Sequence, residues 1–110
     1  MDDDVKRAAQ RALAERVVGG EGTASAELRA GAFHDEGLPP PLDELVGKVT
    51  RTPVRVTEAD YAAAKAAGYS EDQLFELVVC AAVGQSTRLY DAGLAALAEA
   101  TAEGRVDRAT

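Results

Sequence analysis

The chain of 110 residues has few aromatic side chains, no tryptophan, one histidine and one cysteine. A single cysteine, Cys80, excludes an internal disulfide, so a disulfide-stapled secreted scaffold is not expected. His34 is the lone histidine and stands beside Asp35 and Glu36, so no histidine and cysteine cluster exists to bind zinc. The longest nearly continuous apolar run, 77–83, is far shorter than a membrane span.

Basic residues are also in short supply, with 12 lysines and arginines against 19 acidic residues, for a net charge of −7. This balance disfavours nucleic acids and anionic membranes as partners. The start at Met1 is acidic and lacks the apolar segment of a signal peptide, so the cytoplasm is the predicted location. The glycine-rich run 19–22 follows a predicted helix rather than a strand, and we predict no cofactor.

Hydrophobic residues make up 46% of the chain, and most of them are alanine and leucine. Alanine is the best helix former, so this composition predicts an all-α fold with closely packed helices. The length suits one domain spanning 1–110. We expect N-terminal helices and a loop over 1–37, a helical core over 38–103 and a frayed tail over 104–110.

Local signals divide the chain into segments. The first predicted helix starts at the aspartates 2–4 and ends at Gly19, with a narrow alanine stripe typical of loose packing or of contact with another subunit. A short helix is expected over 23–33, with Ser25 as its best signal, and an amphipathic helix follows Pro41. Residues 51–56 are expected to be an extended connector. Thr57 and Asp60 then begin a helix that Gly68 ends.

A long helical segment runs from Ser70 to about residue 102 and ends at Gly104. Ser70 and Gln73 have the spacing of a capping box, and the apolar run that follows predicts a helix buried on most sides. After a polar patch at 84–88 the amphipathic pattern resumes with three apolar positions, Tyr90, Leu94 and Leu97. An unbroken helix would be about 50 Å long, against a radius of gyration of about 13 Å for a compact domain. We therefore expect a kink at Gly84 combined with packing of the far half on a partner chain.

Three groups in this segment bear on chemistry. Cys80 lies among valines and alanines, which predicts an inert, buried thiol. Glu76 lies on the buried helix, so it is an acid/base group with a raised pKa, a residue at the rim of the core, or a residue in an ion pair with an arginine. Arg88 and Asp91 are spaced to pair on one helix face, and with Gln85 they form a polar band that favours a structural role over a catalytic one.

The stretch 56–82, with its Gly-Tyr-Ser-Glu-Asp-Gln-Leu-Phe-Glu-Leu-Val run from Gly68, resembles the carboxymuconolactone decarboxylase and alkylhydroperoxidase D-like superfamily. The resemblance covers about residues 38–100 and implies an all-α fold and homo-oligomers, often trimers or hexamers. In its peroxidase members a glutamate, matched by Glu76, precedes a pair of redox cysteines. Those two places fall at Arg88 and Asp91, and Cys80 is out of register, so thiol peroxidase activity is not expected.

The leading hypothesis is a redox-inactive member of this superfamily that forms a homo-oligomer through its last helix. An alternative is a decarboxylase-type enzyme in which Glu76 is the acid/base and Arg88 binds a carboxylate, with Gln85 and Asp91 as further substrate-binding residues. Such a ligand requires one cavity that Glu76 and Arg88 both face. A third reading is a subunit of a larger assembly, so the sequence leaves open whether the protein catalyses a reaction.

Overall fold

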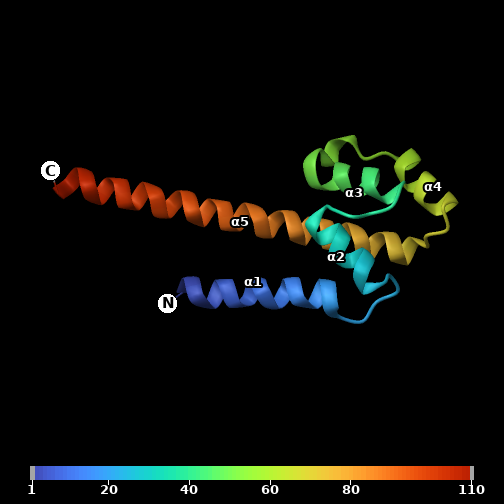
Figure 1. The fold of residues 1–110 in the computed structure, drawn as a ribbon, viewed down its shortest axis with the longest axis horizontal. Helices are drawn as coiled ribbons and strands as arrows, with labels where there is room; N and C mark the ends of the chain where they lie inside the picture. The colour runs from blue at the N-terminus through green and yellow to red at the C-terminus, as the bar shows by residue number, and fades with distance from the viewer. Residues whose placement is uncertain (1, 110) are drawn as a thin grey trace.

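The computed structural model describes the backbone of residues 2–109 and the side chains of residues 4–102. Within these limits the chain consists of helices without strands, which confirms the all-α prediction (Figure 1). The elements are α1 (Asp2–Gly19), α2 (Ala26–His34), α3 (Leu42–Arg51), a 3-10 turn η1 (Pro53–Arg55), α4 (Glu58–Ala66) and α5 (Glu71–Ala109). The predicted long C-terminal helix is α5, with 39 residues.

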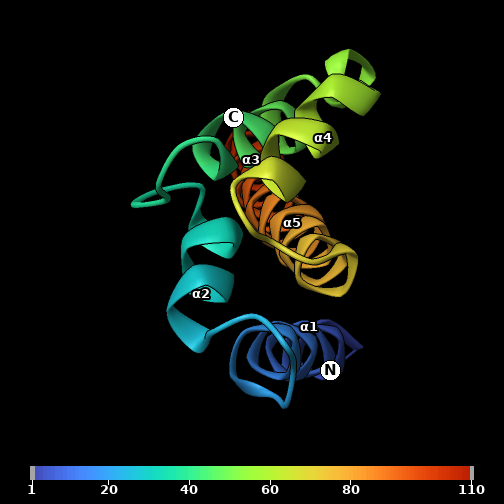
Figure 2. The same ribbon diagram turned by 90° about the vertical axis from the view of Figure 1, so that its right-hand side faces the viewer.

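The core lies where α2, α3 and the first half of α5 meet. α3 is amphipathic and buries Leu42, Leu45 and Val46, as their spacing predicts. α5 contributes Leu74 and Leu77 from its apolar run. In a view along α5, α2, α3 and α4 lie beside and above α5, and α1 lies below it (Figure 2).

Capping residues set the helix boundaries where the sequence predicts them. The Ser70 amide donates to Gln73 Oε1 over 2.8 Å, and the Gln73 amide donates back to Ser70 Oγ over 3.1 Å. Thr57 and Asp60 form a capping box at α4, and Ser25 caps α2 by accepting from the Leu28 amide. These hydrogen bonds satisfy amides that a helix start leaves without an internal partner.

Three local predictions are wrong. The connector expected to be extended contains the turn η1, closed by the Val56 amide donating to the Pro53 carbonyl over 3.2 Å. α5 does not end at Gly104, because its backbone is helical to Ala109. Gly84 does not kink α5, which continues through this position without a sharp bend (Figure 1). The side chains of the predicted frayed tail lie outside the described residues.

The molecule is elongated, with extents of 63 × 29 × 20 Å. α1 runs antiparallel to α5 and contacts it (Figure 1), but α1 has no buried residue among its described side chains. Along α5, none of the described residues after Gly84 is buried either. α1 and the second half of α5 thus form an extension that projects away from the core (Figure 1). No helix within the described residues is both long and apolar enough to cross a membrane.

Candidate functional site

Glu76 holds the N-terminal end of α2 against α5. Its carboxylate accepts from the Thr23 amide at 2.9 and 2.8 Å, from the Ala24 amide at 3.2 Å and from the Thr23 hydroxyl. Both donor residues, Thr23 and Ala24, lie in the loop just before Ser25, the N-cap of α2. A carboxylate near the positive end of a helix dipole and facing several amides is stabilised in its charged form.

The hydrogen bond from the Thr23 hydroxyl is the main cause that lowers the pKa of Glu76, and the Thr23 and Ala24 amides add to the effect. The raised pKa expected for a buried acid/base group is therefore wrong. The ion pair suggested as its alternative is also not formed, since no lysine or arginine nitrogen among the described residues lies within 4.0 Å of this carboxylate. Glu76 acts as a charged hydrogen-bond acceptor for a loop.

Arg29 is a buried charged residue, with 7% of its surface exposed, that no local sequence pattern indicates. Its guanidinium donates to the Ala24 carbonyl at 3.2 Å, to the Val17 carbonyl at 3.4 Å and to the Gly20 carbonyl. These acceptors belong to the end of α1 and the loop that follows. Arg29 thus donates hydrogen bonds to carbonyls that the end of α1 leaves without a partner inside the helix.

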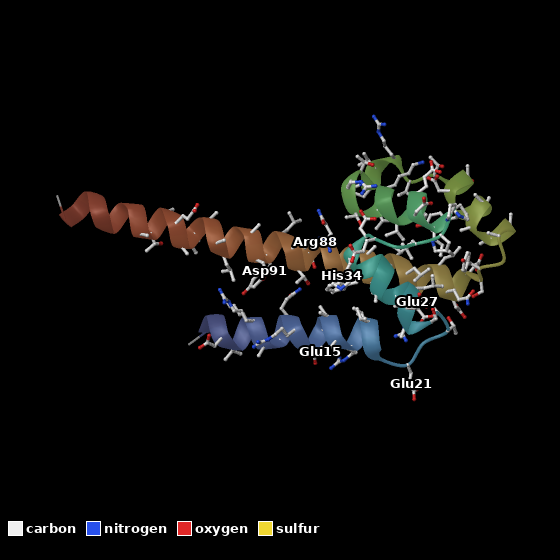
Figure 3. The ribbon with its side chains drawn as sticks, viewed as in Figure 1. Glu15, Glu21, Glu27, His34, Arg88 and Asp91 are labelled. Atoms are coloured by element: carbon white, nitrogen blue, oxygen red, sulfur yellow. The ribbon has the colours of Figure 1, made fainter. Side chains whose placement is uncertain are left out.

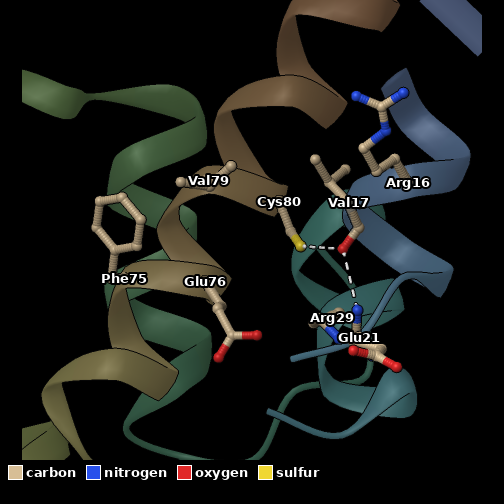
Figure 4. A pocket seen from close by; sticks show the side chains of 8 residues that line it. All are labelled: Arg16, Val17, Glu21, Arg29, Phe75, Glu76, Val79 and Cys80. Carbon is tan, nitrogen blue, oxygen red and sulfur yellow. Dashed lines mark hydrogen bonds between the residues drawn. The ribbon is translucent and has the colours of Figure 1, made fainter. Parts of the chain in front are cut away.

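Cys80 is 1% exposed, and its thiol donates to the Val17 carbonyl over 3.2 Å. Burial raises the pKa of this thiol, which confirms the prediction of a thiol kept in its unreactive protonated form. The thiol lies at the base of a cavity of about 150 Å³ between α1, α2 and α5 (Figure 4). The cavity is lined by Arg16, Val17, Glu21, Arg29, Phe75, Glu76, Val79 and Cys80. A typical ligand pocket starts at about 300 Å³, so this space is small for a substrate.

Arg88 holds the opposite end of α2. Its Nη1 donates to the Phe33 carbonyl over 2.7 Å, and its Nε donates to Gln85 Oε1 over 3.2 Å. One turn before Arg88, Gly84 is buried, and a Cβ added there would overlap the Phe33 carbonyl. The missing side chain of Gly84 lets the backbones of α2 and α5 approach closely, which is the physical role of the glycine expected to be a kink.

Asp91 points toward α1 rather than toward Arg88 (Figure 3). It lines a second cavity, of about 260 Å³, with Arg7, Gln10, Arg11, Ala14, Thr87 and Tyr90. Gln10 Nε2 donates to Thr87 Oγ1 over 2.7 Å, which links α1 to α5 at this cavity. Among the described residues, no Arg88 nitrogen lies within 4.0 Å of an Asp91 oxygen, so the predicted intrahelical pair is not formed.

The structure separates the residues that the enzyme hypothesis requires together. Glu76 and Arg88 are about 18 Å apart along the straight axis of α5, and they bind opposite ends of α2. Neither the cavity of about 150 Å³ nor another one of about 370 Å³ that Glu76 also lines includes Arg88, and the cavity at Asp91 includes neither residue. Gln85 accepts a hydrogen bond from Arg88. Within the described part of the chain, no group of three or more histidine, cysteine or acidic residues is placed to hold a metal ion.

No protein-family model, curated protein or solved structure matches the chain at a significant level. The superfamily resemblance of residues 38–100 therefore stays a prediction. The site consists of two side chains, Glu76 and Arg88, whose hydrogen bonds fasten the two ends of α2 to α5.

Proposed function

We propose that the chain is a homo-oligomeric helical module, similar to the carboxymuconolactone decarboxylase and alkylhydroperoxidase D-like superfamily but without thiol peroxidase activity. The observation that carries the proposal is the extension formed by α1 and the second half of α5. It has no buried residue among those described, although several large apolar side chains lie on it.

The extension lacks the packing that normally stabilises helices. Helices in proteins owe most of their stability to an apolar face buried on other elements. Here Val5 is 66% exposed, and Leu89 and Leu97 are each 63% exposed. Association with a second copy would remove these side chains from water, and each fully buried one contributes about 1.5–3 kcal/mol.

The cysteine chemistry supports the negative part of the proposal. A thiol peroxidase of the resembling type needs two cysteines that form a disulfide, and this sequence has one. Cys80 is buried with a raised pKa, which lowers the thiolate fraction that attacks a hydroperoxide. The positions matching the redox pair carry Arg88, which binds the end of α2, and Asp91.

Size-exclusion chromatography with light scattering tests the oligomer. We expect a mass that is a multiple of the 11.5 kDa chain at micromolar concentration. A strict monomer at that concentration contradicts the proposal. A hydroperoxide-consumption assay with a dithiol reductant tests the absence of peroxidase activity, and turnover above that of Cys80→Ser would contradict it.

The two other readings are separated by their own observations. The decarboxylase-type reading requires Glu76 and Arg88 to face one cavity, and the contacts they make give it no support. The reading as a subunit of a larger assembly predicts that a second polypeptide co-purifies in a fixed ratio. A homo-oligomer predicts one polypeptide only.

A further inference from the structure

One largely exposed face of α5 carries a regular sequence pattern of uncharged residues. Eight positions follow each other at alternating steps of four and three residues, and we call them the seam. They are Phe75, Val79, Ala82, Ser86, Leu89, Gly93, Ala96 and Ala100. Seven of them are exposed and Val79 is half-buried, and none carries a charge in a chain with 28% charged residues. The seam is thus an uncharged surface about 38 Å long.

This spacing predicts the kind of partner. A repeat of 3.5 residues keeps one face of a helix against a second helix that winds around it with a left-handed supercoil. The small residues of the seam would let the two helices approach closely. A flat or globular partner gives no reason for a repeat maintained over 26 residues, whereas a second long helix does.

Resting on the proposed homo-oligomer, we propose that the seam binds the seam of a second copy, with the two α5 helices antiparallel. In this register Phe75 lies opposite Ala100 of the partner subunit. The next layers pair Val79 with the partner's Ala96, Ala82 with the partner's Gly93, and Ser86 with the partner's Leu89. Every seam residue has a seam residue opposite it, which is the property of an interface around a two-fold axis.

The sizes of the side chains support this register. Each of the three large seam residues, Phe75, Val79 and Leu89, faces an alanine or a serine across the axis, and the remaining layer joins Ala82 to Gly93. Large residues opposite small ones keep the helix separation even along the interface. A parallel arrangement in register would instead place phenylalanine on phenylalanine and glycine on glycine, which forces an uneven separation.

The flanking positions support the antiparallel direction as well. There Glu76 would lie beside the partner's Leu97, and Glu99 beside the partner's Val78, so no like charges meet at these positions. A parallel pair would bring Glu71 beside the partner's Glu76, at a cost in repulsion. The opposed helix dipoles of an antiparallel pair are also favourable.

The rest of the fold leaves the seam accessible. α1 contacts α5 through Cys80 and Thr87, and α2 contacts it through Gly84 and Arg88, all of which lie outside the seam. Figure 2 shows α1, α2, α3 and α4 around α5 and one side of α5 free of any helix. The exposed fractions of Phe75 at 71% and Leu89 at 63% agree with this arrangement.

Disulfide trapping with two single-cysteine variants, each in a Cys80→Ser background, tests the register. Ala82→Cys and Gly93→Cys are suited to it, because Ala82 is exposed and a Cβ at Gly93 meets no atom within 4 Å. We expect rapid cross-linking only when the two variants are mixed, because Ala82 faces the partner's Gly93. Cross-linking of either variant with itself would indicate a parallel pair and overturn the proposal.

A charge placed in the seam gives an independent test. Leu89→Glu puts two unpaired carboxylates next to the two-fold axis, and we expect it to weaken self-association about tenfold or more. The matched control is Val54→Glu, because Val54 is 94% exposed in η1, away from α5. If Leu89→Glu leaves the oligomer unchanged, the seam is overturned. The same holds if mixing Ala82→Cys with Gly93→Cys gives no cross-link. Either result leaves the proposed homo-oligomer standing. A monomeric parent protein overturns both.

Discussion

Glu76 and Arg88 contact opposite ends of α2, and each carries the charge that suits its end. The Glu76 carboxylate accepts from amides that precede the N-terminus, and the Arg88 guanidinium donates to a carbonyl at the C-terminus. A helix dipole is positive at its start and negative at its end, so both contacts are favourable. The two residues nominated for catalysis therefore have a clear structural role, which is to fasten α2 along α5.

The lowered pKa of Glu76 predicts a pH-dependent stability. Its contribution is fully present above the ordinary glutamate pKa of about 4.3 and is lost as the pH falls through the lower value of the folded protein. We expect Glu76→Gln to reduce the free energy of unfolding by about 1–2 kcal/mol near neutral pH. Urea unfolding of both proteins across the acid range measures it.

The difference between the native protein and Glu76→Gln should shrink as the pH falls, because protonation removes the same charge from the native side chain. Glu15→Gln is the control, since Glu15 is exposed on α1. A difference that stays constant down to the lowest pH would contradict the role of the Glu76 charge.

Cys80 predicts slow thiol chemistry. The thiol is buried and hydrogen-bonded to the Val17 carbonyl, and burial raises its pKa. A soluble disulfide reagent should therefore modify it only when the protein opens locally or unfolds. We expect labelling of the native protein to be at least about a hundredfold slower than labelling in denaturant. Equal rates in the two conditions would show an accessible thiol.

At the scale of the helices, the sequence predicts the features that depend on residues close together in the chain, which are helix caps and buried helix faces. The capping residues Ser25, Thr57 and Ser70 and the buried face of α3 follow from residues three or four positions apart, and the structure confirms them. The contacts of Glu76 with Thr23 and of Arg88 with Phe33 join residues more than 50 positions apart, which no local pattern encodes. A buried Arg29 could not be predicted either, because its acceptors are backbone carbonyls.

Gly84 illustrates the same limit and leads to a prediction on helix packing. A glycine inside a helix suggests a kink, whereas here it is the point where α2 crosses α5. Gly84→Ala should improve helix propensity yet destabilise the protein by about 1–3 kcal/mol, because the added methyl group overlaps the Phe33 carbonyl.

Thermal or urea unfolding checks this prediction, with Gly19→Ala at the end of α1 as the control, because Gly19 lies outside the seam. A Cβ at Gly19 meets no atom within 4 Å, so this substitution should change the free energy of unfolding by less than about 1 kcal/mol. Equal effects of the two substitutions would mean that α2 does not press on α5 at Gly84.

At the scale of the whole molecule, the shape is the main departure from a compact domain. The radius of gyration is 17.6 Å, whereas a compact chain of this length has about 13 Å. The excess comes from α1 and the second half of α5, which extend beyond the core without burying a described residue. A second chain that covers the seam would give the second half of α5 the packing it lacks.

Sedimentation equilibrium of the unmodified protein across micromolar concentrations tests the central claim most directly. The homo-oligomer predicts a mass that is a multiple of 11.5 kDa, and the two-fold seam further predicts an even number of chains. A trimer would contradict the seam alone. A mass of one chain throughout the range would contradict the proposed homo-oligomer itself.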